Sequence, residues 1–376
     1  MPPPAAVDDL AGTVVACNQA LESISNLSYG ENPHNVEKST TSAIRSDFLS
    51  LLALVRAHST VLSLAFKPPP NYDTISRPLS DIRSDVDKIA GCVHILATSK
   101  KGATFFKQLR SQANVVLDAT RSLVQTFLTT NFDDPEVARS DKTYLLRMGS
   151  LHSAIDQCKA SFPKNNRDAV TALWSSDSET IKDALVEYEE LSNAGSPDSA
   201  ENGEDDGGLD DDFDDWDTVL GQQPSKPLTP EEAAIAKKCW MLIRMVHSLH
   251  TRISSKHLPA IPSSSPYLDK LQGCSTALVE SIDDLTVALY GPQDPSKIRD
   301  GLKDLNSAIQ RLQGTLYEVV GVSSTNGMNA PADASLSDGI KALSLEEAPV
   351  ASETSKDVKW LVSCFAQIDK SISGIP

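Results

Sequence analysis

The sequence predicts an all-α protein made of antiparallel helical bundles, in which long amphipathic helices form two halves joined by an acidic disordered linker. Apolar residues recur three and four positions apart over most of the 376 residues, which places them on one side of a helix. Helix-breaking residues occupy short turns between these stretches. Aromatic residues make up only 5% of the chain, and no stretch has the pattern of a credible strand.

The first three predicted helices follow regular apolar stripes. The first two stripes run over residues 7–24 and 44–62, both with heptad spacing. The third covers residues 72–96, and its helix proper begins near Pro78 because proline is tolerated in a first helical turn.

Three further helices complete the predicted N-terminal half, residues 1–192. They cover about residues 103–130, 135–159 and 166–192. Helix breakers mark the turns at Tyr29–Pro33, Lys67–Asn71, Lys101–Gly102, Asp133–Pro135 and Ser161–Asn166. Because short turns join long helices, neighbouring helices are expected to run antiparallel.

The predicted C-terminal half, residues 229–376, begins with a sharp helix start. Thr229 supplies an N-cap hydroxyl, Pro230 the first helical position and Glu232 a carboxylate at the third position, which together predict a capping box. The rest of this half consists of helices at about 267–290 and 296–320, a flexible loop at about 321–354, and a closing helix that contains residues 358–372.

Heptad-like spacing in helices of about 25 residues favours up-and-down bundles, either one or two of them. A coiled-coil dimer is the alternative, but prolines recur roughly every 30 residues and would interrupt a long two-stranded rod. Oligomeric state stays open.

The predicted linker, residues 193–228, is rich in Ser, Gly, Asp and Pro and lacks the periodic apolar positions that fold into a core. Within it, Leu209, Phe213, Trp216 and Leu220 fall at helical spacing among carboxylates. Such a segment is expected either to dock as a short helix into a groove of a partner, or to act as an acidic spacer whose aromatic residues attach it to its own bundle.

Charge and composition exclude several classes of function. The formal charge is −17, and eleven acidic residues lie between Asp198 and Asp217 with no Lys or Arg among them. An acidic chain without a basic cluster is not expected to bind nucleic acid directly or anionic membranes. Six separated cysteines are expected to be reduced core thiols, and no signal peptide or membrane span is expected, so the predicted location is cytoplasmic and nuclear.

No catalytic motif is found in the sequence, so we expect no enzyme, no metal and no cofactor. A nucleophile elbow and phosphate-binding glycine loops are both missing. Two metal-like spacings exist, Glu31 with His34 in a proline-containing turn and His247 with His250 on a helix, but neither is accompanied by further ligands.

Two proline-directed positions are candidate phosphorylation sites. Ser196 precedes Pro197 in the linker, and Thr229 precedes Pro230 at a predicted helix N-terminus. A phosphate at Thr229 would be favoured by the helix dipole, which makes a regulatory switch conceivable there.

Three segments together resemble the cyclin-D-binding protein family, also called Grap- and cyclin-D-interacting proteins. They are Asp85–Phe127, Pro163–Leu191 with its Pro-Lys-Asn-Asn-Arg turn, and Glu280–Asp294. The acidic insert between the halves also matches, so the resemblance covers nearly the whole chain.

The resemblance implies a non-enzymatic protein-interaction regulator. Its partners would be D-type cyclins or cyclin-like proteins, adaptor proteins and helix-loop-helix transcription regulators, and its effect would be to damp cell-cycle progression or transcription. Two other readings stay open: a cytoskeletal or adhesion-type bundle scaffold, since talin- and vinculin-like proteins also stack long amphipathic helices, and an iron-binding bundle enzyme.

Overall fold

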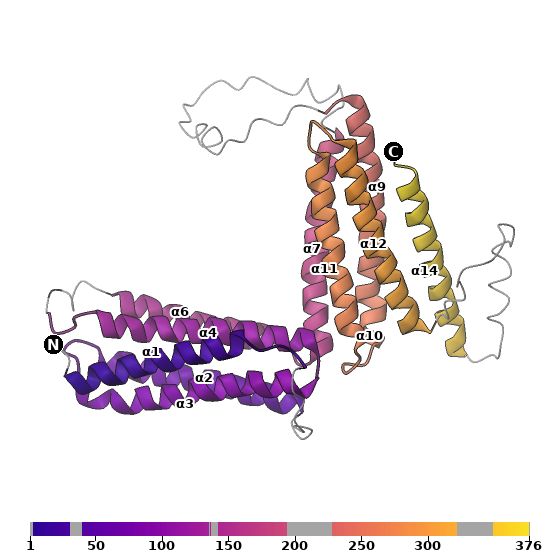
Figure 1. The fold of residues 1–376 in the computed structure, drawn as a ribbon. Helices are drawn as coiled ribbons and strands as arrows, with labels where there is room; N and C mark the ends of the chain where they lie inside the picture. The colour runs from indigo at the N-terminus through magenta and orange to yellow at the C-terminus, as the bar shows by residue number, and fades with distance from the viewer. Residues whose placement is uncertain are drawn as a thin grey trace, which may run out of the picture. The chain divides into compact units, whose positions relative to one another are not determined.

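The computed structural model describes residues 3–30, 40–134, 136, 142–193, 228–321 and 349–375. Over these residues the chain forms ten long α-helices and no strand (Figure 1). The all-α class expected from the apolar periodicity is therefore confirmed.

The chain divides into two compact units. The N-terminal unit contains Met1–Ala172 and Pro262–Asp269, and the C-terminal unit contains Leu173–Ile261 and Lys270–Pro376. Helix α7 (Asn166–Asn193) begins in the first unit and continues in the second, whereas the periodicity predicts that it belongs wholly to the first half. The predicted linker and most of the predicted loop at 321–354 lie outside the described residues, so the predicted domain limits stay a prediction.

Five long helices form the body of the N-terminal unit. Helix α1 packs against α3 and α4, α2 packs against α3 and α6, and α4 packs against α6. Their bounds are Pro4–Ser25 for α1, Thr41–Ala65 for α2, Ser76–Ser99 for α3, Ala103–Thr129 for α4 and Thr143–Ser161 for α6, and a 3₁₀ turn, η1, covers Tyr72–Thr74. Figure 1 shows these helices side by side.

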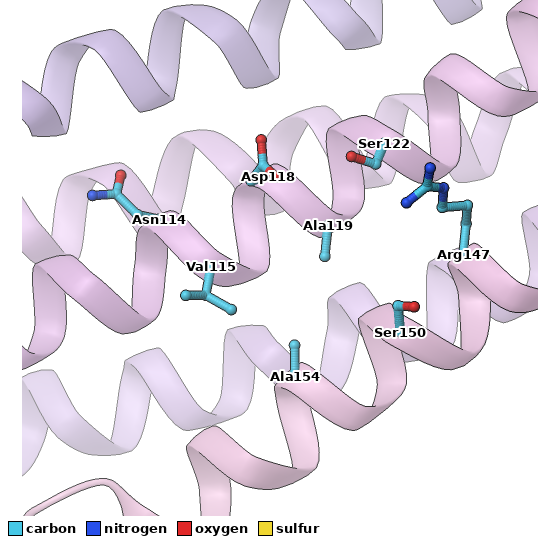
Figure 2. Close-up of a pocket in the computed structure, with 8 residues that line it drawn as sticks. All are labelled: Asn114, Val115, Asp118, Ala119, Ser122, Arg147, Ser150 and Ala154. Atoms are coloured by element: carbon cyan, nitrogen blue, oxygen red, sulfur yellow. The ribbon is translucent and has the colours of Figure 1, made fainter. Parts of the chain in front are cut away.

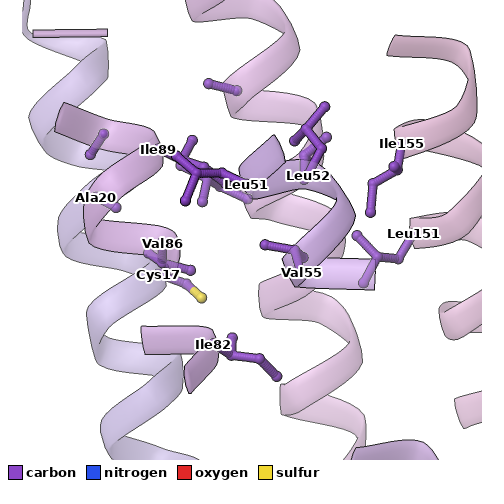
Figure 3. Packing of buried hydrophobic residues seen from close by; sticks show 14 of the residues in the cluster. Cys17, Ala20, Leu51, Leu52, Val55, Ile82, Val86, Ile89, Leu151 and Ile155 are labelled. Atoms are coloured by element: carbon purple, nitrogen blue, oxygen red, sulfur yellow. The ribbon is translucent and has the colours of Figure 1, made fainter. Parts of the chain in front are cut away.

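The interior of this unit is made by the predicted apolar stripes. Cys17 of α1, Val55 of α2, Val86 of α3 and Leu151 of α6 all have 0% exposure, and Figure 3 shows their close packing. Burial of an aliphatic side chain of this size stabilises a fold by about 1.5–3 kcal/mol. The core therefore holds the helices together without any disulfide, since all six cysteines are free.

The C-terminal unit is built from the rest of α7 and four further long helices. Helix α14 packs against α9 and α12. The bounds are Pro230–Arg252 for α9, Tyr267–Leu289 for α11, Pro295–Val320 for α12 and Pro349–Ser373 for α14, and a π-helical turn, η3 (Ile253–His257), links α9 to the short α10 (Leu258–Ala260). Trp174 and Tyr188 of α7 are fully buried in this unit.

Helix starts agree with the sequence signals where these are strong. The capping box at Thr229 is present, because its hydroxyl accepts from the Glu232 amide at 3.3 Å and the Glu232 carboxylate accepts from the Thr229 amide at 2.8 Å. Helix α3 begins at Ser76, close to the expected Pro78. Helix α6 begins at Thr143 instead of about 135, and residues 135 and 137–141 lie outside the described part of the chain.

The expectation that no stretch is long and apolar enough to span a membrane needs correction. Helix α2 is 25 residues long and contains an 18-residue window with a mean hydropathy of 1.6, so it is long and apolar enough to cross a membrane by length and composition. A core helix of a bundle passes the same test, and α2 has polar contacts that suit a core helix. Arg45 donates to the Pro163 carbonyl at 3.0 Å, and the Nδ1 atom of His58 lies 2.8 Å from the buried carboxylate of Asp85.

The N-terminus of α4 is capped by side chains distant in sequence. The Asp269 carboxylate accepts from the amides of Ala103 and Thr104, both at 2.9 Å, and from the Thr104 hydroxyl at 2.7 Å. The Asn166 side chain accepts from the Phe105 amide at 2.9 Å and donates to Asp269 at 3.2 Å. These bonds satisfy amides that the first turn of a helix leaves unpaired.

Close approach of Asn166 also explains the glycine before α4. Gly102 has a φ of +124°, which disfavours residues with a side chain, and a Cβ atom there would lie 2.1 Å from the Cγ atom of Asn166. Glycine is thus required by both the backbone conformation and the available space.

We predict that Asp269→Ala lowers the free energy of unfolding by about 1–2 kcal/mol, because it removes the cap from the first turn of α4. Urea denaturation followed by helical circular dichroism measures this change. The control is Asp304→Ala, which removes an exposed carboxylate on α12 and should leave the midpoint unchanged. Equal midpoints for the two variants would show that the cap does not stabilise the fold.

Candidate functional site

A buried polar network in the C-terminal unit is the first place to look for chemistry. The Trp174 indole donates to the His250 carbonyl at 3.1 Å and its ring stacks on the His250 imidazole, with centroids 4.4 Å apart. His250 Nε2 lies 2.8 Å from the Ser275 hydroxyl, which donates to Asp177 at 2.5 Å.

The order of these groups does not suit nucleophilic catalysis. A Ser-His-Asp triad places the histidine between the serine and the carboxylate, so that the histidine takes the serine proton. Here Ser275 stands in the middle and gives its proton to Asp177. Both His250 and Ser275 have 0% exposure, and burial lowers the pKa of His250 to about 3, which makes it a weak base. The network therefore fixes the register of α7, α9 and α11.

The cysteines are not poised to react either. Burial raises the pKa of Cys17, Cys158 and Cys239 to about 12, and that of Cys92 to about 11. These thiols stay protonated at neutral pH, and the thiolate is the form that attacks or binds metal. The expectation of reduced core thiols is thereby confirmed for the five buried cysteines.

Neither of the two residue pairs with metal-like spacing is found in a metal site among the described residues. Glu31 and His34 lie outside the described residues. His250 is bound within the polar network, whereas His247 Nε2 lies 3.4 Å from the Ser178 hydroxyl. Within the described ranges, no group of three or more His, Cys, Asp or Glu side chains could hold a metal ion.

Among the candidate partner-binding and phosphorylation residues, Thr229 is the one that the structure describes. Its hydroxyl and amide are both used by the capping box, and the Glu232 carboxylate also accepts from the Gln293 amide at 2.8 Å. A phosphate on Thr229 would stand beside this carboxylate, so the dipole's attraction would compete with repulsion between two anions. The other candidates, Leu209, Phe213, Trp216, Leu220 and Ser196, lie outside the described residues.

A first surface groove of about 500 Å³ lies between α4 and α6. Figure 2 shows Val115 and Ala119 of α4 facing Ala154 of α6. The side chain of Val115 is 50% exposed, while Asp118 and Arg147 carry the charges of the groove. With small residues and no aromatic side chain, this groove offers little apolar area to a partner.

A second groove, of about 680 Å³, lies between α9 and α14 in the C-terminal unit. One face of each helix supplies its walls, because the lining positions recur at spacings of three and four residues. These residues are Trp240, Met241, Arg244, Met245 and Ser248 from α9, and Trp360, Ser363, Cys364, Gln367 and Ser371 from α14. We call this surface the α9/α14 groove.

Ion pairs and aromatic contacts hold α14 in place along this groove. Arg252 pairs with Asp357 and lies over the Trp360 ring, with the guanidinium carbon 4.2 Å from the centroid. At the other end, the Lys238 ammonium donates to the Gly374 carbonyl at 3.0 Å. The two helices therefore present a preformed groove.

The chemistry of the α9/α14 groove is that of a protein-binding surface. Tryptophan, methionine and arginine are enriched at interfaces, and methionine adapts its shape to different partners. Met241 is 49% exposed, and Arg244 lies over the Trp240 ring at 5.2 Å. Apolar periodicity does not predict this groove, because Trp240, Met241 and Met245 fall outside the buried positions of α9.

The described part of the chain thus defines a class of protein: a two-unit helical-bundle protein whose surface offers grooves for partners and whose buried polar groups are used for packing. The comparison with protein families gives the same class a name. Residues 47–194 match the family model described as Grap2 and cyclin-D-interacting, N-terminal, and residues 209–314 match the corresponding C-terminal model. The chain belongs to this family.

Two relatives are similar over most of their length. Both are described as Cyclin-D1-binding protein 1 homolog. The protein from Xenopus laevis is 26% identical over 260 residues, which cover 68% of this chain and 73% of the relative. The protein from Danio rerio is 25% identical over 264 residues, which cover 69% of this chain and 72% of the relative.

We predict that His250→Phe reduces the acid sensitivity of the C-terminal unit. A free histidine has a pKa near 6.5, so unfolding takes up a proton below that pH while folded His250 stays neutral down to about pH 3. Stability is therefore expected to fall as the pH drops from about 6.5, by up to roughly 1.4 kcal/mol per pH unit from this group.

Urea midpoints at pH 7.5, 6.0 and 5.0 measure this slope. Phenylalanine keeps the stack on Trp174 but cannot take up a proton. The exposed His94→Gln is the control and should retain the wild-type slope. An unchanged slope in His250→Phe would mean that the buried imidazole is protonated without unfolding.

Proposed function

We propose that this protein is a non-enzymatic regulator that binds D-type cyclins and, through other surfaces, adaptor proteins and helix-loop-helix transcription regulators. Its effect would be to damp cell-cycle progression or transcription. The observation that carries the proposal is the match of both halves to the Grap2 and cyclin-D-interacting family, together with two relatives named for cyclin D1 binding.

The architecture supports binding as the mode of action. The apolar stripes are buried by packing within each unit. Exposed helix faces, grooves and segments between helices are therefore the surfaces that can contact partners. The cytoplasm and nucleus are the proposed locations, because the proposed partners act there.

Residues 209–220 are proposed as one of the contacts with a partner. They lie outside the described residues, so support comes from their sequence: Leu209, Phe213, Trp216 and Leu220 recur at helical spacing among aspartates. The C-terminal family match also begins at residue 209, so the segment belongs to the part of the chain shared with the family. Aromatic side chains of this kind often provide most of the energy of an interface.

Binding of the purified full chain to a purified D-type cyclin tests the proposal. We predict that Phe213→Ala with Trp216→Ala weakens binding by about tenfold or more, because two anchoring aromatic side chains are lost. Thermal unfolding should change little. Isothermal titration calorimetry and circular dichroism measure the two effects.

A matched control is Val287→Ala with Leu146→Ala, which removes two side chains that are 73% and 72% exposed in the described units. This control should bind as the unchanged chain does. Loss of helicity in the aromatic variant would instead assign the two residues to the fold. Failure of the full chain to bind any D-type cyclin, with capture of actin or adhesion components, would favour the scaffold reading.

A further inference from the structure

The α9/α14 groove has a charge opposite to that of the chain as a whole. Residues 233–257 contain five basic residues and no acidic residue, and residues 356–375 contain three basic and two acidic residues. In a chain of formal charge −17, these two segments carry a net charge of +6. The groove therefore lies in the basic part of an acidic protein.

The basic residues stand along the edges of the groove. Lys237 lies four residues before Met241 and seven before Arg244, which places it on the helix face that lines the groove. On α14, Lys356 lies four residues before Trp360, and Lys370 lies three residues after Gln367. By this spacing Lys237, Lys356 and Lys370 flank the groove, and Arg244 lines it.

Asp357, three residues before the lining Trp360, is already paired with basic side chains. Asp357 pairs with Arg252 and lies 3.4 Å from the Lys256 ammonium, and the hydrogen bond from Arg252 lowers the pKa of Asp357. Asp369 lies on another face of α14, since it does not share the three- and four-residue spacing of the lining positions. An approaching ligand thus meets positive charge at the edges and apolar surface inside.

The inside of the groove fits bulky apolar side chains. Trp240 and Trp360 stand on opposite walls, while Ser248, Ser363, Cys364 and Ser371 are small and leave space between them. Met241 and Met245 can adjust to the shape of an inserted side chain. A volume of about 680 Å³ accommodates several side chains in a row.

We propose that the α9/α14 groove binds an acidic amphipathic helix of a partner protein, whose aromatic and aliphatic residues enter the groove while its carboxylates face the basic edges. This is a helix-in-groove mode of recognition with electrostatic steering. The inference rests on the proposed function, since it assigns the described surface through which an interaction protein of this kind takes one class of partner.

A defined peptide probe tests the inference with the full chain. The probe is residues 207–222 of this sequence as a fluorescein-labelled peptide, chosen because it combines six aspartates with Leu, Phe, Trp and Leu at helical spacing. Fluorescence anisotropy should show saturable binding. Arg244→Glu and Met241→Ala should each weaken binding by about tenfold.

Two matched variants control for charge and apolar surface. Arg299→Glu makes the same charge change at an exposed position on α12, and Val287→Ala removes an exposed apolar side chain on α11. Both should bind within about twofold of the unchanged chain. A peptide with the same composition but scrambled apolar positions should bind about tenfold more weakly, since charge alone does not fill the groove.

Several outcomes would overturn the inference. If the scrambled peptide binds as tightly as the probe, the binding is non-specific charge attraction. A different outcome is that the chain fails to bind the peptide and binds phosphatidylserine vesicles or single-stranded DNA. If Arg244→Glu abolishes that binding, the groove is assigned to a membrane or to a nucleic acid. Binding only after Phe213→Ala with Trp216→Ala would identify residues 209–220 of the same chain as the occupant. If the peptide fails while D-type cyclin still binds, the groove is excluded and the proposed function stands.

Discussion

The burial of apolar stripes between neighbouring helices is the interaction on which the rest of this structure depends. Each long helix has one apolar side, and no helix can hide that side alone, so stability comes from packing rather than from helix propensity. Free buried cysteines and fully buried side chains such as Leu52 and Leu278 show that packing, without covalent links, forms both units.

Buried polar groups add positional precision to this packing. Apolar stripes with similar spacing can slide past one another, whereas a hydrogen bond between fixed atoms selects one register. Asp269 and Asn166 at the start of α4 serve this purpose in the N-terminal unit, and the network of Trp174, His250 and Ser275 serves it in the C-terminal unit. Residue types that also occur in catalytic sites, such as His250 and Ser275, thus define the positions of helices in this protein.

Periodicity and caps in the sequence were sufficient to predict the all-α class, the ten long helices and the start of α9 at Thr229. They could not predict the cap on α4, because Asp269 is more than 160 residues distant from Ala103 and their contact depends on tertiary packing. The α9/α14 groove could not be predicted either, because its two walls are far apart in the sequence. In addition, apolar periodicity identifies buried positions rather than exposed ones. The membrane-like composition of α2 was not expected either, because Arg56 and His58 interrupt the apolar run, yet an 18-residue window of the helix still has a mean hydropathy of 1.6.

We expect the two units to stay closed while partners bind to their surfaces. Hydrogen–deuterium exchange of the full chain, alone and with a bound D-type cyclin, tests this expectation most directly. If the units stay closed, exchange slows only in surface segments, and the slow exchange at the buried stripes of α3, α4 and α11 does not change. Faster exchange along those stripes when the partner binds would show that the bundles open to expose their apolar faces, and would contradict surface binding by closed units.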